Sequence, residues 1–297
     1  MLKRVISGTV YAALLLGFFL MKIYLPNPWG SLAFDALIFF FAIVGTREML
    51  RAAGALVTKT EKTIVTIFSL VCVPACALAE AFAAGGVYAV AGCTLLLCVA
   101  LLCLLVFKNA ETRVENLGSA FVCAVYPTLL LCVLTMVNHF VGKEGALFTD
   151  SVLAMLFIFI IAPVSDVMAF FTGMGLRKKF PKKFAPTISP NKTLVGFIGG
   201  ILGGALAGVG IYFGYNAICG DFTNMYIGLP VYLLVGLVAS AFSAFGDLVE
   251  SAIKRERGIK DMGNIMPGHG GVLDRIDGTM FTAVVVYAAF LLAGLFV

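Results

Sequence analysis

Residues 251–277 read SAIKRERGIKDMGNIMPGHGGVLDRID and lie between two apolar runs of membrane-spanning length. The segment combines charged residues, glycines and one of the two histidines of the chain. An ionisable group near hydrocarbon costs free energy and needs a partner or a task. A simple membrane anchor would have no use for such a segment. We therefore expect a membrane protein whose polar segment has a chemical task.

The composition of the chain points to lipid surroundings. Of its 297 residues, 61% are hydrophobic and 12% are charged, and the mean hydropathy is +1.04. A soluble domain carries about 25% charged residues. Seven of the eight cysteines lie inside apolar runs, where cysteine behaves as a small hydrophobic residue. The composition therefore predicts a membrane protein and argues against an extracellular disulfide scaffold.

The apolar runs predict nine membrane-spanning helices, each near the ~20 residues that cross a bilayer. They cover residues 5–25, 29–46, 63–82, 85–107, 117–141, 150–174, 193–215, 227–250 and 278–297. The first run is longer than the apolar core of a secretory signal, so we expect it to be retained. The expected fold class is an all-α polytopic membrane protein.

The second half of the chain carries the long polar segments. We therefore divide the chain into residues 1–145, with about five N-terminal helices, and residues 146–297, a catalytic membrane region. Its polar loops cover residues 175–192 and 251–277.

The basic residues indicate the orientation of the helices. With a cytoplasmic N-terminus and alternating spans, nineteen of the twenty-one Lys and Arg residues fall on the cytoplasmic side. Only Lys22 and Lys143 fall outside. Cytoplasmic loops of membrane proteins carry such an excess of basic residues. The pattern predicts an outside C-terminus, and it places both polar loops in the cytoplasm, where nucleotides are found.

Two acidic pairs near helix ends could hold a divalent metal ion. Asp247 and Glu250 lie three residues apart, as do Asp274 and Asp277, and this spacing puts each pair on one helix face. Magnesium prefers one or two carboxylates together with phosphate oxygens and water. The nearby basic residues are Lys254, Arg255, Lys260 and Arg275. They could bind phosphate groups, or they could anchor the chain at an anionic membrane surface.

A second polar constellation lies earlier in the chain. Asp166 falls inside the sixth span, where an acid is either functional or bonded to a neighbouring helix. The run Ser189-Pro190-Asn191-Lys192-Thr193 lacks the glycine of a P-loop but could face phosphate as it enters the seventh span. His269 precedes Gly270 and Gly271, in a loop that could bring backbone amides to phosphate or could be a plain turn.

These motifs resemble those of the phosphatidate cytidylyltransferases, or CDP-diacylglycerol synthases. The matching elements are Asp166-x-x-Ala169-Phe170, Ser189-Pro190-x-Lys192-Thr193, Gly196-Phe197-Ile198-Gly199-Gly200, Gly246-Asp247, Lys254-Arg255, Lys260-Asp261, His269-Gly270-Gly271 and Asp274-Arg275-x-Asp277. They cover residues 160–280, and the N-terminal half is similar in hydropathy only. Val195 departs from the pattern, because many relatives carry a polar or acidic residue there.

The resemblance implies transfer of the cytidylyl group of CTP to phosphatidic acid, which gives CDP-diacylglycerol and pyrophosphate. It implies Mg²⁺ held by Asp247 and Asp274, with Asp277 as a third ligand or an orienting group, and a monovalent cation such as K⁺ beside it. The other catalytic residues that it implies are Lys254, Arg255, Lys260, Asp261, His269 and Arg275. The substrate-binding residues that it implies are Asp166, Ser189, Lys192, Thr193, Gly270 and Gly271.

Two other functions stay open at this point. One is a CTP-dependent polyprenol or lipid kinase, and the other is a secondary transporter that uses Asp166 as an ion site. A transporter usually has two related halves, which we do not find in the sequence. We expect an enzyme of the bacterial plasma membrane with CTP and phosphatidic acid as substrates and no nucleic-acid partner. Its oligomeric state stays open, with a homodimer as one option.

Overall fold

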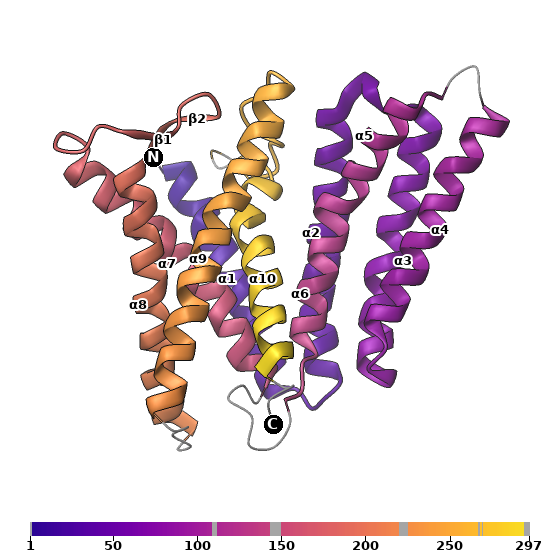
Figure 1. The fold of residues 1–297 in the computed structure, drawn as a ribbon. Helices are drawn as coiled ribbons and strands as arrows, with labels where there is room; N and C mark the ends of the chain where they lie inside the picture. Colours follow the sequence, from indigo (N-terminus) through magenta and orange to yellow (C-terminus); the bar gives the residue numbers. More distant parts are fainter. Residues whose placement is uncertain are drawn as a thin grey trace. The chain divides into compact units, whose positions relative to one another are not determined.

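The computed structural model describes residues 2–108, 112–142, 150–219, 225–266, 268 and 270–293 (Figure 1). Within these residues, nine helices are long and apolar enough to cross a membrane, and they correspond to the nine predicted spans. The prediction of an all-helical, multi-span membrane protein is therefore confirmed for this part of the chain, whereas the orientation stays a prediction. Lys143, His269 and residues 294–297 of the predicted ninth span lie outside the described residues.

The backbone forms two compact units. Unit 1 contains Met1–His139 and Glu256–Arg275, and unit 2 contains Phe140–Arg255 and Ile276–Val297. The elements of the N-terminal part of unit 1 are α1 (Leu2–Tyr24), α2 (Trp29–Ala53), η1 (Gly54–Leu56), α3 (Lys59–Ala83), α4 (Gly86–Phe107), α5 (Val114–Ala124), η2 (Val125–Leu129) and α6 (Leu130–Asn138). The later elements are α7 (Ser151–Leu176), β1 (Lys183–Ala185), β2 (Ser189–Thr193), α8 (Leu194–Cys219), α9 (Met225–Glu256) and α10 (Leu273–Ala293).

The segment 251–277, called the signature segment below and its loop the signature loop, therefore belongs largely to the unit that the N-terminal helices form. Sequence reasoning assigned this segment to the C-terminal catalytic region. The functional division into residues 1–145 and 146–297 stays a prediction.

The structure departs from the expected elements at two places. The loop expected at 175–192 contains an antiparallel hairpin, in which Lys183 pairs with Thr193 and Ala185 pairs with Ser189. Helix α10 begins at Leu273, earlier than the expected start at residue 278. Asp274 and Asp277 consequently lie on the first turns of α10, where their spacing puts them on one helix face.

A buried polar cluster ties three helices of unit 1 together. The ammonium group of Lys22 on α1 donates to the carbonyl oxygen of Asn138 on α6, at 2.7 Å. The Asn138 amide nitrogen donates to Oδ1 of Asp35 on α2, at 2.8 Å. The other oxygen of Asp35 lies 2.6 Å from Nε2 of His139. Buried polar groups are stable only with such partners, so the cluster fixes how these helix ends meet.

Glycines let the helices of unit 2 approach closely. A Cβ atom on Gly200 of α8 would lie 3.0 Å from the carbonyl oxygen of Ser165 and 3.1 Å from the Cβ of Ala169, both on α7. Helix α8 also packs against α9, where Gly208 of α8 faces the carbonyl oxygen of Tyr232. Small residues at such positions allow backbones in a membrane to pack against each other. The glycine run of α8 is therefore explained by helix packing.

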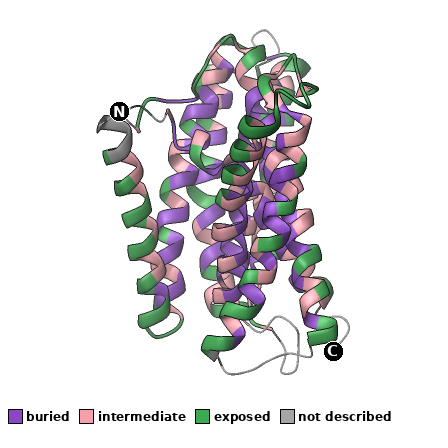
Figure 2. Cartoon of the chain, turned by 90° about the vertical axis from the view of Figure 1, so that its left-hand side faces the viewer, coloured by how far each residue is buried: buried purple, intermediate pink, exposed green. Residues whose placement is uncertain are grey.

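Exposed residues occur along the helices (Figure 2), and many of them are large and apolar. Examples are Leu95, Leu96 and Val99 on α4, and Leu202 and Leu206 on α8. A soluble monomer rarely exposes apolar side chains over so much of its helices. This surface suits contact with lipid chains.

Candidate functional site

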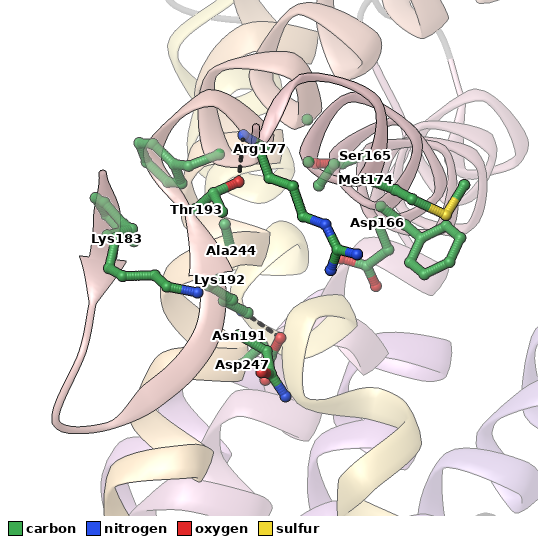
Figure 3. Close-up of a pocket in the computed structure, with 17 residues that line it drawn as sticks. Ser165, Asp166, Met174, Arg177, Lys183, Asn191, Lys192, Thr193, Ala244 and Asp247 are labelled. Carbon is green, nitrogen blue, oxygen red and sulfur yellow. Dashed lines mark hydrogen bonds and ion pairs between the residues drawn. The ribbon is translucent and has the colours of Figure 1, made fainter. Parts of the chain in front are cut away.

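A cavity of about 650 Å³ lies within unit 2. Its walls come from α7, the β1–β2 hairpin, the first turns of α8 and one side of α9 (Figure 3). Four of the predicted catalytic or substrate-binding residues line this cavity: Asp166, Lys192, Thr193 and Asp247. Three separate motifs supply these residues. The fold therefore brings the second polar constellation and the Gly-Asp motif of α9 to one place.

The cavity carries charges of both signs. Lys192 forms an ion pair with Asp247, and the two side chains are 31% and 35% exposed. On the α7 side, the guanidinium group of Arg177 and the carboxylate of Asp166 point toward one another (Figure 3). Lys183 of β1 adds a third basic group to the wall. Basic groups of this kind can bind phosphate oxygens, and the carboxylates offer the hard oxygen atoms that a divalent cation prefers.

Thr193 marks the point where the hairpin becomes helix α8. Its side-chain oxygen accepts a hydrogen bond from the backbone N–H of Gly196, at 3.1 Å, as an N-cap residue does. A Cβ atom on Gly196 would lie 2.9 Å from the carbonyl oxygen of Ala169, so only glycine lets this turn approach α7. The N-terminus of a helix carries partial positive charge. The start of α8 therefore adds to the attraction of this wall for phosphate.

A second group of acids lies one turn further along α9. Glu250 is fully buried, and one of its oxygens lies 2.8 Å from the ammonium group of Lys254. The carboxylates of Glu250 and Asp247 are near enough to Asp277 of α10 for their charges to act on it. The backbone N–H of Gly278 donates to Asp277 at 2.7 Å. Lys254 therefore compensates a buried carboxylate, and its predicted role as a phosphate clamp stays a prediction.

The signature loop in unit 1 is organised around Asp274. Its Oδ2 atom accepts hydrogen bonds from the backbone N–H groups of Met262, at 2.9 Å, and Gly271, at 2.7 Å. Between them the chain turns back on itself, because the N–H of Met266 donates to the carbonyl oxygen of Gly270 at 3.0 Å. Gly270 has φ +88°, a conformation that favours glycine, and a Cβ there would lie 2.7 Å from Asp274 Oδ2. Asp274 thus holds both ends of the loop.

The other predicted residues of unit 2 lie around the hairpin. Arg255, at the end of α9, donates from Nε to the carbonyl oxygen of Ile188 at 3.3 Å, and so holds the turn of the hairpin. Ser189 belongs to β2 and is not among the described residues that line the cavity. The roles predicted for both residues stay predictions.

The remaining predicted residues belong to unit 1. Lys260, Asp261 and Arg275 are exposed. The predicted role of His269 cannot be placed in the structure, because this residue lies outside the described ones.

Sequence reasoning missed several residues that the structure brings to the candidate sites. Arg177, Lys183 and Asn191 line the cavity. Two of them stand in a basic run that the sequence explained by topology alone, and Asn191 was quoted only as part of a motif. Glu48 was also missed, although it contacts the signature loop through Val272 and Leu273. The available signal was an acid two residues after the end of the predicted span 29–46.

The chain is similar in sequence to a known protein family. It matches the profile of the cytidylyltransferase family over residues 3–293, which is nearly its whole length. The chain belongs to the cytidylyltransferase family.

Individual relatives match over shorter regions. A phosphatidate cytidylyltransferase of Staphylococcus epidermidis is 42% identical over 127 residues, which cover 43% of this chain and 45% of the relative. One of Haemophilus influenzae is 40% identical over 124 residues, or 41% of this chain and 40% of the relative. One of Thermotoga maritima is 34% identical over 185 residues, or 62% of each chain. The matched regions therefore span about half the length of these relatives.

Proposed function

We propose that this protein transfers the cytidylyl group of CTP to phosphatidic acid, giving CDP-diacylglycerol and pyrophosphate. The main support is the cavity of unit 2, which combines Lys192, Arg177 and Lys183 with the carboxylate of Asp247 in a chain of the cytidylyltransferase family. The relatives named above carry the name phosphatidate cytidylyltransferase. The three basic side chains of the cavity suit substrates that both carry phosphate.

The reaction requires little covalent participation by the protein. An oxygen of the lipid phosphate forms a bond to the α-phosphorus of CTP, while the bond from that phosphorus to the bridging oxygen breaks and pyrophosphate leaves with the electron pair. The lipid phosphate is already an anion at neutral pH. The protein must therefore reduce the repulsion between two anions, align them, and stabilise the charge on the leaving group.

We assign the basic residues of the cavity to this electrostatic task. Lys192 would release Asp247 and bind a phosphate group when substrate enters, while the start of α8 behind Thr193 presents its positive end. Arg177 can bind two phosphate oxygens at once through its planar guanidinium group, and Lys183 acts as a point charge. Phe184 and Phe197 form part of the cavity wall, and their stacked rings have centroids 4.0 Å apart. These rings would limit the access of water from that side.

The carboxylates of the motifs Gly246-Asp247 and Asp274-Arg275-x-Asp277 are ligands of the kind that magnesium prefers. Among the described residues, no three His, Cys, Asp or Glu side chains form a group that would hold a metal ion by themselves. Magnesium needs only one or two carboxylates when phosphates supply further oxygens. Asp247 and Asp274 are the residues that would hold it, and their motif positions support this assignment. Bound magnesium would neutralise phosphate charge, and a monovalent cation such as K⁺ stays a prediction.

The basic residues also support an orientation for the site. With the N-terminus in the cytoplasm, the hairpin with Lys183 and Lys192 faces the compartment that contains CTP. We therefore propose a plasma-membrane enzyme with a cytoplasmic site and an outside C-terminus.

A labelled-substrate assay tests the proposed function. Purified protein in mixed micelles receives phosphatidic acid, magnesium and CTP that is labelled either at the α- or at the γ-phosphorus. With α-labelled CTP, we expect the label in the lipid product. With γ-labelled CTP, we expect an unlabelled lipid product and labelled pyrophosphate. Lipid label from the γ-position would instead indicate a lipid kinase. A complete lack of product, with substrate-dependent ion flux in vesicles, would favour a transporter.

A further inference from the structure

Glu48 of α2 lies at the start of α10 within unit 1. Its two carboxylate oxygens accept hydrogen bonds from the backbone N–H groups of Val272 and Leu273, both at 3.0 Å. The second contact joins residues 225 positions apart in the sequence. The Glu48 side chain is 4% exposed, and Val272 and Leu273 are fully buried beside it. A buried carboxylate is costly unless it is well bonded, so these contacts hold it in one place.

The surrounding chain is shaped to fit this carboxylate. A Cβ atom on Gly263 or on Gly271 would lie against the Glu48 carboxylate, closer than Cβ atoms approach other atoms in proteins. The side chain of Leu273 packs on Gly45, one turn earlier on α2. The loop therefore surrounds the carboxylate on two sides and is anchored to α2 by apolar contact as well.

Glu48 and Asp274 share the same loop. Asp274 binds the amides of Met262 and Gly271, and Glu48 binds the next two amides along the chain. Four backbone N–H groups around the start of α10 are thus divided between two carboxylates. The first N–H groups of a helix have no partner inside the helix, and anions stabilise this end. Here the anion comes from α2 and not from a capping residue next to the helix.

We propose that Glu48 is a positioning residue for the cytidylyl transfer, which fixes the start of α10 and thereby the direction of the Asp274 carboxylate. This inference rests on the proposed function and on the assignment of Asp274 as a magnesium ligand. The amides that Glu48 holds directly precede Asp274 in the chain, so a change in their position passes to Asp274 without an intermediate. The N-terminal helices thus take part in the reaction, although the family motifs lie in the C-terminal half.

The test replaces Glu48 by Gln, which keeps the size of the side chain but offers only one acceptor to two amides. Residues that orient a metal ligand typically contribute about 10–100-fold to activity or metal affinity. We therefore expect Glu48→Gln to lower kcat by about 10–100-fold and to raise the magnesium concentration for half-maximal turnover by about tenfold. The KM for CTP at saturating magnesium should change less than kcat.

Glu61→Gln is the matched control. Glu61 is another fully buried carboxylate of unit 1, and it accepts the N–H of Thr58 at the start of α3, at 2.7 Å. A general effect of removing a buried acid would appear equally in both variants. We expect Glu61→Gln to lower thermal stability without changing the magnesium requirement.

Hydrogen exchange gives a readout that does not depend on activity. In Glu48→Gln, the amides of Met262, Gly271, Val272 and Leu273 should exchange faster than in the wild-type protein, while Glu61→Gln should leave them unchanged. Gly263→Ala provides a second variant, because its methyl group would displace the Glu48 carboxylate, and Gly118→Ala, with open space around it, is its control.

The outcomes separate the two proposals. If the wild-type protein makes no CDP-diacylglycerol, the proposed function fails, and hydrogen exchange still reports on Glu48. If the wild-type protein is active while Glu48→Gln and Gly263→Ala keep its turnover, magnesium requirement and exchange pattern, the positioning role is wrong. If Glu48→Gln does not fold, Gly263→Ala alone decides in the same way.

Discussion

Lys192 of the hairpin and Asp247 of α9 form an ion pair at the wall of the cavity in unit 2. Both side chains are about one-third exposed, so the pair contributes little to stability, about 0–1 kcal/mol. Each group is of a kind that binds a different part of the proposed substrate complex, Lys192 the phosphate and Asp247 the metal ion. In the proposed function, these two ligands would replace the ion pair.

Replacement of Lys192 by Ala should impair substrate use more than folding. The positive charge at the mouth of α8 is lost, so we expect the KM for CTP or for phosphatidic acid to rise about tenfold or more, in keeping with the 1.5–3 kcal/mol typical of a hydrogen bond to a charged group. Saturation kinetics in each substrate measure this effect. Lys182→Ala is the control, because Lys182 is exposed next to the hairpin and does not line the cavity. Unchanged constants for both substrates would reduce Lys192 to a surface anchor.

Replacement of Asp247 or Asp274 by Asn should lower turnover strongly. Asn keeps the shape of the side chain but lacks the anionic oxygen that a hard cation needs, and lost charge stabilisation of this kind costs about 10²–10³ in rate. Assays across a magnesium titration measure the loss, with Glu115→Gln as a control at an exposed acid of α5. Thermal melting should show folded protein, since Asn at 274 still offers an acceptor to Met262 and Gly271. Near-normal turnover in either variant would point instead to Asp277 and Glu250.

Hydropathy was sufficient to predict the helices. In lipid, backbone N–H and C=O groups without hydrogen bonds cost free energy, so an apolar segment that crosses the membrane forms a helix or part of a closed barrel. Every predicted span corresponds to one helical segment among the described residues, and the fifth segment consists of α5, η2 and α6 together. The convergence of Asp166, Lys192 and Asp247 on one cavity was less accessible, since it depends on the way α7, α8 and α9 pack. The sequence motifs identified these residues, and the glycines of α8 allow the close helix packing that brings them together.

The hairpin and the Glu48 contact could not be predicted from the sequence. The run from Lys183 to Thr193 contains Pro, Lys and Asn, which are poor strand formers, and its pairing depends on the neighbouring helices. Glu48 lies at a predicted span end, where an acid is usually solvated. Its partners are backbone N–H groups, which leave no trace in the identity of the residues that carry them.

The charge pattern predicts the accessibility of both chain ends. With nine spans and a cytoplasmic N-terminus, a tag after Val297 should react with membrane-impermeant reagents in intact cells, and a tag before Met1 should not. A tag in the exposed segment just before β1, at Lys182, serves as the internal control and should also be protected. Protection of the C-terminal tag would mean that one of the nine helices does not cross the membrane.

The buried cluster around Asp35 should govern the stability of unit 1. Asp35 accepts the Asn138 side-chain amide at 2.8 Å and contacts His139 at 2.6 Å, while Lys22 bonds the backbone of the same helix end. Asp35→Ala leaves these polar groups buried without the acid, and removal of one partner from a buried charged cluster costs on the order of 3–5 kcal/mol. We expect a clear fall in melting temperature in detergent. The melting temperature of Asp35→Asn should fall less, because its carbonyl oxygen still accepts from Asn138.

Turnover per folded molecule should stay close to wild type in Asp35→Asn, since Asp35 lines neither the cavity nor the signature loop. Equal melting temperatures for Asp35→Ala and the wild-type protein would show that apolar packing alone holds these helix ends.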